Sequence, residues 1–263
     1  MLCYTECMAR SLPNFVHLHT HSHYSLLNAL PKIEDLVAAA KEDGQQALAL
    51  TDNGNLYGAI DFYKECKKAG IKPLIGVDLY VAPRTRHDKE HRIDDRASRL
   101  VLIAKDETGY RNLVKLVSRA HLEGFYYNPR ADRELIAQYK DGLIAILPSF
   151  AGEPSKHLKD GDTERAGESL AWFRETFGDD LYAEITRHPE IEGHEERMLA
   201  WGAFAKERGV PLVAAHDTYY LEKDDAIARE LVVKIKTGGH LDRDMGVGAE
   251  DFSFISRARV AEL

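Results

Sequence analysis

The chain has 263 residues, of which 44% are hydrophobic, and it carries a formal net charge of -8. This length supplies one large core, and a single α/β barrel of about 250 residues would use all of it. The negative charge excludes a protein that is drawn to DNA by its overall field. Any contact with DNA must therefore be local or belong to a neighbouring domain.

The sequence indicates neither secretion nor a membrane span. Its first 13 residues, MLCYTECMARSLP, lack a basic start followed by a long apolar run. No stretch approaches the roughly 18 apolar residues of a membrane helix. Three cysteines are too few for a disulfide framework, and we read Cys3 and Cys7, whose spacing some metal sites use, as free thiols because no second pair follows. We expect a cytoplasmic protein with a loosely attached N-terminus over residues 1–13.

Short apolar runs alternate with amphipathic helices in the first half of the chain. After the apolar pair Phe15-Val16, a helical face is formed by apolar residues every three or four positions, beginning after Pro31 and ending before Gly44. The residues of that face are Ile33, Leu36, Val37 and Ala40. Buried strands are predicted at residues 47–51, 73–77 and 100–103, and helices at residues 56–69 and 110–122.

The second half continues the alternation. Strands are predicted at residues 143–147, 181–185 and 211–215, and helices at residues 165–177 and 195–208, with a closing helix after them. About seven strands separated by helices predict parallel βα units. No GxGxxG motif follows the first strand, which favours a closed, TIM-barrel-like α/β fold over an open sheet. We expect one domain over residues 14–263, with a solvated loop at the charged segment 84–96.

Ligand-type side chains follow several of the predicted strands. In α/β barrels the carboxyl ends of the strands build the active site. Within the predicted strands or next to their ends stand His17, His19, His21, His23, Asp52, Asn53, Asp78, Arg99, Phe150, Glu184, His188, His216 and Asp217. The sequence therefore predicts a site at one rim of the barrel.

The alternating histidines predict a metal site. Alternate residues of an extended segment face the same side, about 6.5 to 7 Å apart, so His19 and His21 can converge on one ion. The alternative is that both are hydrogen-bonded polar residues at a barrel mouth. For His17 and His23 we favour that structural alternative. Imidazole suits zinc, manganese or iron, and Asp78 and Asp217 would complete such a site.

Four long blocks carry a resemblance to a known family. They are FVHLHTHSHYSLLNALPKIEDLVAAAK, ALALTDNGNLYGAIDFYKECKKAGIKPLIGVDLYVAP, LVLIAKDETGYRNLVKLVSRAHLEGFYYNPR and PLVAAHDTYYL. In this order they resemble the PHP (polymerase and histidinol phosphatase) domains of bacterial DNA polymerase III alpha subunits. The resemblance implies a distorted seven-stranded (βα)7 barrel that carries up to three metal ions on nine ligands and hydrolyses phosphoesters. In some polymerases of this family the site is a 3′–5′ proofreading exonuclease, and in others it has decayed.

The ligand positions of the family are only partly kept. His19, His21 and Asp217 match, and Asp78 stands in place of the usual Glu, so the resemblance implies one divalent ion, Zn, Mn or Fe, on these four residues. Five positions depart from the pattern: Asn28 for Asp, Asn53 for His, Arg99 for His, Phe150 for Cys and Tyr219 for His. We expect two of the three metal positions to be lost.

Several other residues near the rim are accessory candidates or have two alternative roles. Arg99 either enters a former metal position, where it would repel a second ion and pair with Asp78, or points outward from the rim. His23, His188 and His216 are candidates to replace a lost ligand from a neighbouring position, and Glu184 is a further accessory candidate. We interpret Asp52 as a structural hydrogen-bond acceptor at a strand end.

Three functions remain open on the sequence. The first is a structural domain with a degenerate site, which braces the polymerase alpha subunit and helps to place other replisome subunits; DNA would be contacted mainly by domains outside this chain. The second is an active metal-dependent 3′–5′ proofreading exonuclease. The third, a free-standing phosphatase of the histidinol-phosphate type, is disfavoured by the block TGYRNLVKLVSRAHLEGFYY. The implied parent is a DNA-directed DNA polymerase, a nucleotidyltransferase, and the end of the chain at Leu263 favours a piece of that longer protein.

Overall fold

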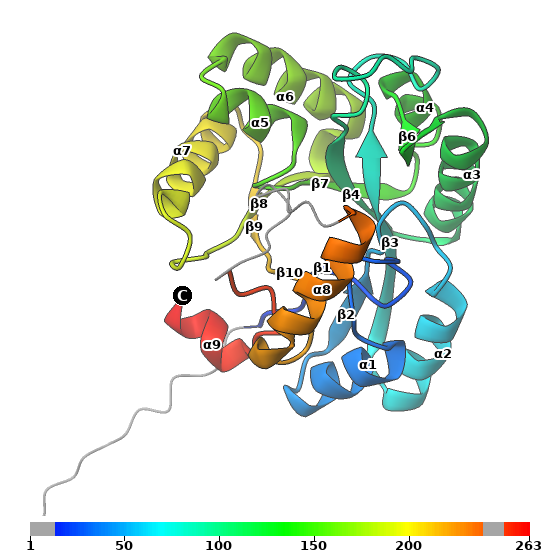
Figure 1. Ribbon diagram of the computed structural model, residues 1–263, viewed down its shortest axis with the longest axis vertical. Helices are drawn as coiled ribbons and strands as arrows, with labels where there is room; N and C mark the ends of the chain where they lie inside the picture. Colours follow the sequence, from blue (N-terminus) through cyan, green and yellow to red (C-terminus); the bar gives the residue numbers. More distant parts are fainter. Residues whose placement is uncertain (1–13, 239–249) are drawn as a thin grey trace, which may run out of the picture.

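The computed structural model describes residues 14–238 and 250–263 (Figure 1). The strands are β1 (His19–Thr20), β2 (Ala47–Leu50), β3 (Lys72–Val81), β4 (Ser98–Ala104), β5 (Phe125–Tyr126), β6 (Asn128–Ala131), β7 (Leu143–Leu147), β8 (Leu181–Ile185), β9 (Leu212–Ala214) and β10 (Asp217–Thr218). The helices are α1 (Ile33–Glu42), α2 (Ala59–Ala69), α3 (Glu107–Glu123), α4 (Arg133–Gln138), α5 (Glu153–Lys159), α6 (Thr163–Phe177), α7 (His194–Glu207), α8 (Ala226–Lys236) and α9 (Arg257–Glu262), with short 3-10 turns η1 (Gly178–Asp180) and η2 (Lys223–Asp225).

The strands form a curled sheet that closes into a barrel through backbone hydrogen bonds. The main sheet runs β3–β4–β7–β8–β9, with β2 and the β6–β5 hairpin both paired to β3, and β1 pairs with β10 in a separate short ladder. The amide of Ala49 donates to the carbonyl of His17, and the amide of Thr51 donates to that of Thr20, so β1 is joined to β2. Strand β10 follows β9 after two residues and pairs with β1, so the strands form a closed circuit. The predicted seven-stranded barrel is confirmed.

The prediction that all strands are parallel is wrong for β4. This strand lies antiparallel to both of its neighbours, β3 and β7, whereas β2 and β3, β7 and β8, and β8 and β9 are parallel. Parallel neighbours need a long crossover, usually a helix, while antiparallel neighbours need only a loop. The link between β3 and β4 is the charged segment 84–96, which contains no helix. The reversal of β4 makes the barrel a distorted one.

The first strand and several short elements also differ from the sequence prediction. The strand expected at Phe15-Val16 lies at His19–Thr20 instead, and residues 14–18 have no strand although Phe15 is buried. Helices α4 and α5, of six and seven residues, and the β5–β6 hairpin were not predicted. Elements this short show too few turns for a hydrophobic period to emerge. Cys3 and Cys7 lie outside the described residues.

Helices cover the outside of the barrel and create separate apolar layers. The predicted face of α1 is buried, with Ile33, Leu36, Val37 and Ala40 packing in one cluster together with α2. A larger cluster joins α3, α4, α6 and α7 to the outer faces of β3, β4, β7 and β8. Inside the barrel a third cluster contains Ala49, Val101, Ile103 and Ile146. Apolar side chains therefore pack both faces of the sheet.

The charged segment 84–96 is mostly exposed, as predicted, but hydrogen bonds from a buried arginine hold its backbone. The fully buried Arg130 donates hydrogen bonds to the backbone carbonyls of Arg86, Asp88 and Asp94, at 3.2, 2.8 and 2.7 Å. Arg86 and Asp94 are themselves buried, which corrects the expectation of a wholly solvated loop. The arginine guanidinium has five N–H donors, so one side chain can donate hydrogen bonds to several carbonyls.

Candidate metal centre

Four elements bring ionisable side chains to one end of the barrel. The ladder between β1 and β10 places His19 opposite Asp217. An isolated bridge ties Asn53 to Asp78 near the middle of β3, and Glu184 comes from β8. All of these residues except Asn53 are buried. Parallel strands end at the same edge of a barrel, which is why residues so distant in sequence meet here.

The first group of metal-ligand side chains contains His19, His21 and Asp78. Nε2 of His19 and Nε2 of His21 each lie 3.3 Å from Oδ2 of Asp78. Arg99 donates to both oxygens of the same carboxylate, through Nε to Oδ1 at 2.9 Å and through Nη2 to Oδ2. Its guanidinium also lies over the Tyr80 ring, 4.0 Å from the centroid. A metal ion at Asp78 would have to displace Arg99.

The charges around Asp78 set the protonation of this group. Burial alone would raise the pKa of Asp78, but the Arg99 guanidinium and hydrogen bonds from His19 and His21 hold that pKa well below its usual range. Burial lowers the pKa of His21 to about 4, and the nearby cations His19 and Arg99 add to that effect. The carboxylate is therefore ionised and already compensated by a fixed positive charge.

The second group contains His19, Glu184 and Asp217, with one ligand atom of each within 4.8 Å of the others. Nδ1 of His19 lies 2.9 Å from Oε2 of Glu184. Burial would raise the pKa of Asp217, but His188 and His19 hold it well below its usual value. Oδ1 of Asp217 is buried without a hydrogen-bond partner. Two carboxylates, one of which has an unpartnered buried oxygen, and an imidazole fit one divalent ion of the zinc, manganese or iron class.

The structure thus divides the four residues that the sequence proposed as one ligand set. It brings His19, His21 and Asp78 together, but gives both oxygens of Asp78 to Arg99. It brings Asp217 to His19 together with Glu184, which the sequence ranked only as accessory. The signal for Glu184 was its place in a buried strand, where an ionisable residue needs a partner.

The side chains at the positions that differ from the family pattern make packing and amide contacts. Asn28 donates a hydrogen bond to Asn53, and Asn53 donates to Asp78 at 3.3 Å. The Tyr219 ring stacks on His21, with centroids 4.2 Å apart and an interplanar angle of 8°. Phe150 packs against His188 at 5.4 Å. None of these contacts offers a cation the anionic oxygen, imidazole nitrogen or thiolate sulfur that the resemblance implies at these positions.

The remaining predicted residues lie around the two groups. His17 is buried and its Nε2 contacts the carbonyl of Ile255 at 2.9 Å. Asp52 accepts hydrogen bonds from the amide and hydroxyl of Ser22 and from the hydroxyl of Ser25, and burial raises its pKa to about 6. His188 lies beside Asp217, and the His216 ring stacks on the His188 ring, 5.0 Å away.

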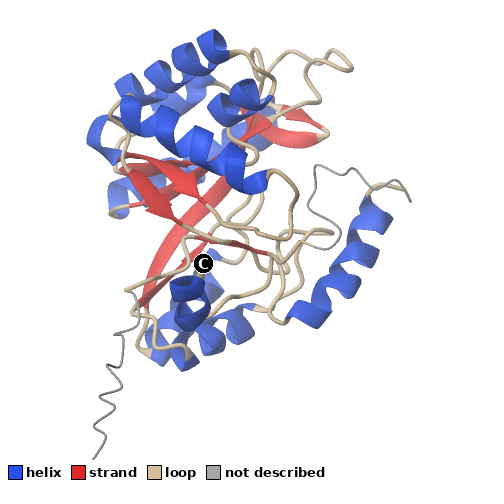
Figure 2. Ribbon diagram, turned by 90° about the vertical axis from the view of Figure 1, so that its left-hand side faces the viewer, coloured by secondary structure: helices blue, strands red, loops and turns tan. Residues whose placement is uncertain are grey.

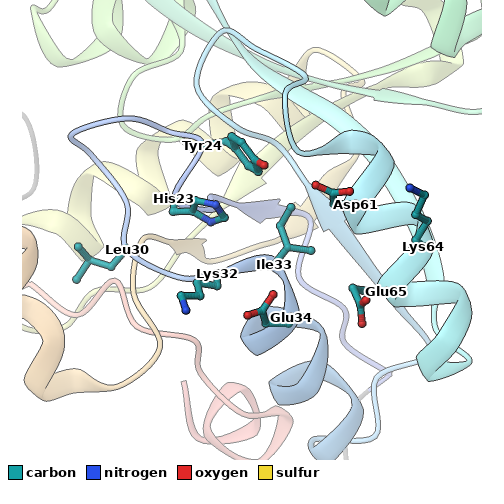
Figure 3. Close-up of a pocket in the computed structure, with 9 residues that line it drawn as sticks. All are labelled: His23, Tyr24, Leu30, Lys32, Ile33, Glu34, Asp61, Lys64 and Glu65. Carbon is teal, nitrogen blue, oxygen red and sulfur yellow. The ribbon is translucent and has the colours of Figure 1, made fainter.

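His23 faces a different part of the molecule. Its Nδ1 lies 3.3 Å from the carbonyl of Pro31. Figure 3 shows it lining a pocket of about 430 Å³. The other lining residues are Tyr24, Leu30, Lys32, Ile33, Glu34, Asp61, Lys64 and Glu65. None of these residues belongs to either metal-ligand group, so the pocket is separate from the candidate metal centre.

Comparison with known proteins identifies the family. The sequence profile of the PHP domain matches residues 17–188. This chain belongs to the PHP domain family. It is 42% identical over 227 residues to DNA polymerase III subunit alpha of Borreliella burgdorferi, and 44% identical over 226 residues to that of Treponema pallidum. Each match covers 85% of this chain but only 20% and 19% of the relative. The chain therefore spans about a fifth of the length of these curated PHP relatives.

A solved structure has a similar fold. A predicted metal-dependent phosphoesterase from Bifidobacterium adolescentis superimposes with a TM-score of 0.51, at 13% identity, over 77% of this chain and 86% of that one. At this identity the likeness concerns the fold alone. Among the residues that the structure describes, no helix has the length and apolar character needed to cross a membrane.

Proposed function

We propose that this chain is the PHP domain of a DNA polymerase III alpha subunit and that it has a structural role in the replicative polymerase. Its phosphoesterase-type site would be reduced to at most one divalent ion. The observation that carries this proposal is the pair of Arg99 with both oxygens of Asp78. Residues 14–263 would form one domain of the longer chain.

The argument against phosphoester hydrolysis rests on the charge and chemistry of the departed positions. Two-metal hydrolysis needs ions about 3.5–4 Å apart, one near each oxygen of the displacement. Arg99 keeps its positive charge in proteins and has no lone pair to offer a cation. Held on Asp78, it compensates the carboxylate that a second ion would need. Phe150 and Tyr219, packed on His188 and His21, leave no replacement at their own positions.

One ion position fits the geometry. His19, Glu184 and Asp217 would hold it, and when bound it would supply Lewis-acid polarisation of a phosphoester oxygen. His19 is shared between Glu184 and Asp78, so it links this position to the arginine pair. An ion here would chiefly neutralise two buried carboxylates and hold β1, β8 and β10 together.

Helix α8 supports a role in assembly with the rest of the polymerase. Ile227, Leu231 and Ile235 are 70%, 57% and 70% exposed and follow at intervals of four residues, so they share one helical face. Val233 and Arg229 are buried on the opposite side. Figure 2 shows α8 at the outer edge of the molecule, away from the helices that cover the sheet. Because the curated relatives are about five times as long, we propose that another part of the polymerase chain covers this stripe.

The proposal is tested on the full polymerase chain. We expect no Mn²⁺- or Zn²⁺-dependent release of nucleotides from single-stranded DNA above the level of a variant carrying His19→Ala and Asp217→Ala. Hydrolysis above that control would overturn the structural role and favour the proofreading exonuclease. The double substitution Ile227→Glu, Leu231→Glu should lower polymerase activity or stability, while Leu199→Glu, an exposed leucine on α7, should not. Equal behaviour of the two variants would refute the docking stripe.

A further inference from the structure

A group of exposed apolar side chains lies around the β5–β6 hairpin. Tyr57, Phe125 and Tyr127 are 60%, 53% and 65% exposed, and Leu122, in the last turn of α3, is 85% exposed. The His121 ring joins them, because its centroid lies 6.4 Å from the centroids of both Tyr57 and Phe125. Single apolar residues on a surface need no explanation, but a contiguous exposed group indicates an interaction site. We call these five residues the aromatic patch.

Contacts between three elements hold the aromatic patch in place. Nε2 of His121 lies 3.0 Å from the carbonyl oxygen of Gly54, so the end of α3 contacts the loop after β2. Gly54 has a φ of +64°, and a Cβ there would lie 2.9 Å from Pro129 of the hairpin. The buried Arg130 donates to the carbonyl of Gly124 at 3.1 Å, which joins the hairpin to the end of α3. The patch is therefore preformed, and this lowers the entropic cost of binding a partner.

Tyr127 stands at the tip of the hairpin in a backbone conformation that tyrosine rarely adopts. Its φ is +59°, and the residues on either side of it, Tyr126 and Asn128, pair with each other. Glycine or asparagine tolerates such a φ, whereas a bulky residue there is an outlier. The Tyr127 ring meets the Tyr126 ring edge-on, with centroids 4.7 Å apart, and stays mostly exposed. A strained residue that keeps its ring in solvent points to a function for that ring.

Exposed cations stand next to the hairpin. The Arg130 guanidinium lies over the Tyr126 ring, 5.2 Å from the centroid, and donates to the carbonyl of Asp94, so the hairpin contacts the charged segment 84–96. Every acidic side chain of that segment contacts another residue of the segment. Within the part of the chain that the structure describes, three exposed cations of the segment make no side-chain hydrogen bond or ion pair: Lys89, Arg92 and Arg96. A partner that docks here should therefore carry acidic groups.

The composition of the aromatic patch favours a polypeptide over a nucleic acid as its partner. Leu122 is the most exposed large apolar side chain among the described residues, and it has no ring on which a base could stack. The net charge of -8 on the whole chain also opposes a phosphate backbone. Aromatic side chains at the centre of a contact with charged groups at its rim are typical of protein interfaces.

We propose that the aromatic patch docks another part of the longer polymerase chain, at a segment with an apolar anchor and acidic side chains beside it. This inference rests on the proposed function, in which the chain is one domain of the polymerase, and adds a second contact face to that of α8. The curated relatives are about five times as long as this chain, so they contain further segments that could cover the patch. Figure 1 shows α2, α3 and β6 on the right-hand side of the view, whereas α8 crosses its middle. The two faces can therefore be tested separately.

Hydroxyl-radical footprinting read by mass spectrometry tests the proposal, because the rate of oxidation follows the exposure of each side chain. In the 263-residue chain, Leu122, Phe125 and Tyr127 should be oxidised readily. In the full polymerase chain without DNA, the same side chains should lose most of that oxidation. Leu199, which is 60% exposed on α7, is the control and should be oxidised equally in both. Equal oxidation of the patch in the two chains would overturn the inference.

Tyr127→Asn separates docking from folding. Asparagine tolerates a positive φ, so the melting temperature of the 263-residue variant should not fall. In the full polymerase chain the same substitution should restore oxidation at Leu122 and Phe125. A lower melting temperature of the 263-residue variant would mean that the ring supports the fold, which would overturn its role in docking.

Charge reversal tests the acidic character of the partner. Lys89→Glu in the full polymerase chain should weaken the protection of the patch from oxidation. Lys206→Glu, at an exposed lysine in the last turn of α7, is the matched control and should not. Protection that is the same in both variants would overturn the proposed acidic partner.

Other occupants of the patch would be revealed by what the protection requires. Protection that appears only after single-stranded DNA is added would mean a nucleic acid, and protection of the 263-residue chain that rises with its concentration would mean a second copy. Either result would overturn the inference. Protection of the α8 stripe beside an unprotected patch would overturn it too, but would leave the proposed function standing. If neither face is protected, the proposed role in assembly fails as well.

Discussion

Arg99, which is half-buried, forms a two-point ion pair with the buried Asp78 at the end of the barrel that holds the candidate metal centre. The pair places a permanent cation of the chain beside a carboxylate of the first metal-ligand group. An arginine fork matches a carboxylate in two hydrogen bonds, which an ammonium cannot do. Nε2 of His19 and Nε2 of His21 also contact this carboxylate, so Asp78 links Arg99 to both histidines of the first ligand group.

Removing the cation of this pair should destabilise the protein strongly. Arg99→Met would leave the ionised, buried Asp78 without its main partner, and breaking a buried pair from one side costs about 3–5 kcal/mol. Urea unfolding at neutral pH measures the change. The double variant Arg99→Met, Asp78→Asn should recover most of the loss, because no uncompensated charge remains. If the double variant is as unstable as the single one, packing of Arg99 on Tyr80 matters more than charge.

A histidine at position 99, which the resemblance to the PHP family implies there, should let the first ligand group bind a metal ion. Arg99→His removes the fixed cation and adds an imidazole near His19, His21 and Asp78, so we expect a second equivalent of Zn²⁺ or Mn²⁺ to bind. Elemental analysis after dialysis counts the ions. Arg99→Gln, which also lacks the charge but offers no imidazole, is the matched control and should stay at one equivalent or fewer. A count that does not rise in Arg99→His would contradict the view that Arg99 occupies a metal position.

Metal should stabilise the chain through Asp217. For one ion at 100 times its dissociation constant, binding adds about 2.7 kcal/mol to the free energy of unfolding. A chelator should therefore lower the melting temperature of the unaltered chain and leave that of Asp217→Asn almost unchanged. Asp251→Asn serves as a control, since Asp251 is half-buried and accepts hydrogen bonds from Ser253 rather than facing the two ligand groups. Equal chelator responses in the unaltered and Asp217→Asn chains would argue against a metal at this aspartate.

Asp52 should make stability fall as pH rises between about 4 and 6. Burial raises its pKa to about 6, against hydrogen bonds from Ser25 and Ser22 that oppose the rise. In that window the folded chain keeps the proton and the unfolded chain releases it, so deprotonation favours unfolding. A shift of about two units corresponds to roughly 3 kcal/mol.

The substitution Asp52→Asn isolates this effect. An amide cannot ionise, and the hydroxyls of Ser22 and Ser25 can turn to suit it. Urea unfolding at a series of pH values should show the stability of the unaltered chain falling relative to Asp52→Asn from pH 4 to 7. Two parallel curves would mean that Asp52 is ionised in the folded chain throughout.

Arg130 should hold the 84–96 segment closed. Arg130→Met would strip hydrogen bonds from four carbonyls, those of Gly124, Arg86, Asp88 and Asp94, and each buried carbonyl left unpaired costs about 1–3 kcal/mol. Trypsin should then cut the segment faster at its own basic residues, with the rate followed by gel and mass spectrometry. Arg119→Met, at a half-exposed arginine of α3, should leave the rate unchanged. Equal digestion of both variants would show that the segment is held by other contacts.

The pattern of residues along the chain was enough to predict the architecture. Alternation of apolar runs and amphipathic faces predicts about seven strands, and the face of Ile33, Leu36, Val37 and Ala40 is buried as its period requires. The direction of β4 was missed because a parallel and an antiparallel buried strand have the same apolar signature. Only the absence of a helix in the link before it carried the signal.

The sequence by itself determined that His19 and His21 face one side, because side chains of an extended chain alternate. The resemblance to the PHP family also implies that five ligand types of its pattern are missing. Only the tertiary structure decided which partner each remaining side chain takes: Arg99 for Asp78, Glu184 and Asp217 for His19, Glu190 for His188. The physical reason is the separation along the chain over which each effect acts. Periodicity acts over a few residues, whereas a buried charge is satisfied by whichever group the closure of the barrel brings within about 3 to 4 Å, from anywhere in the chain.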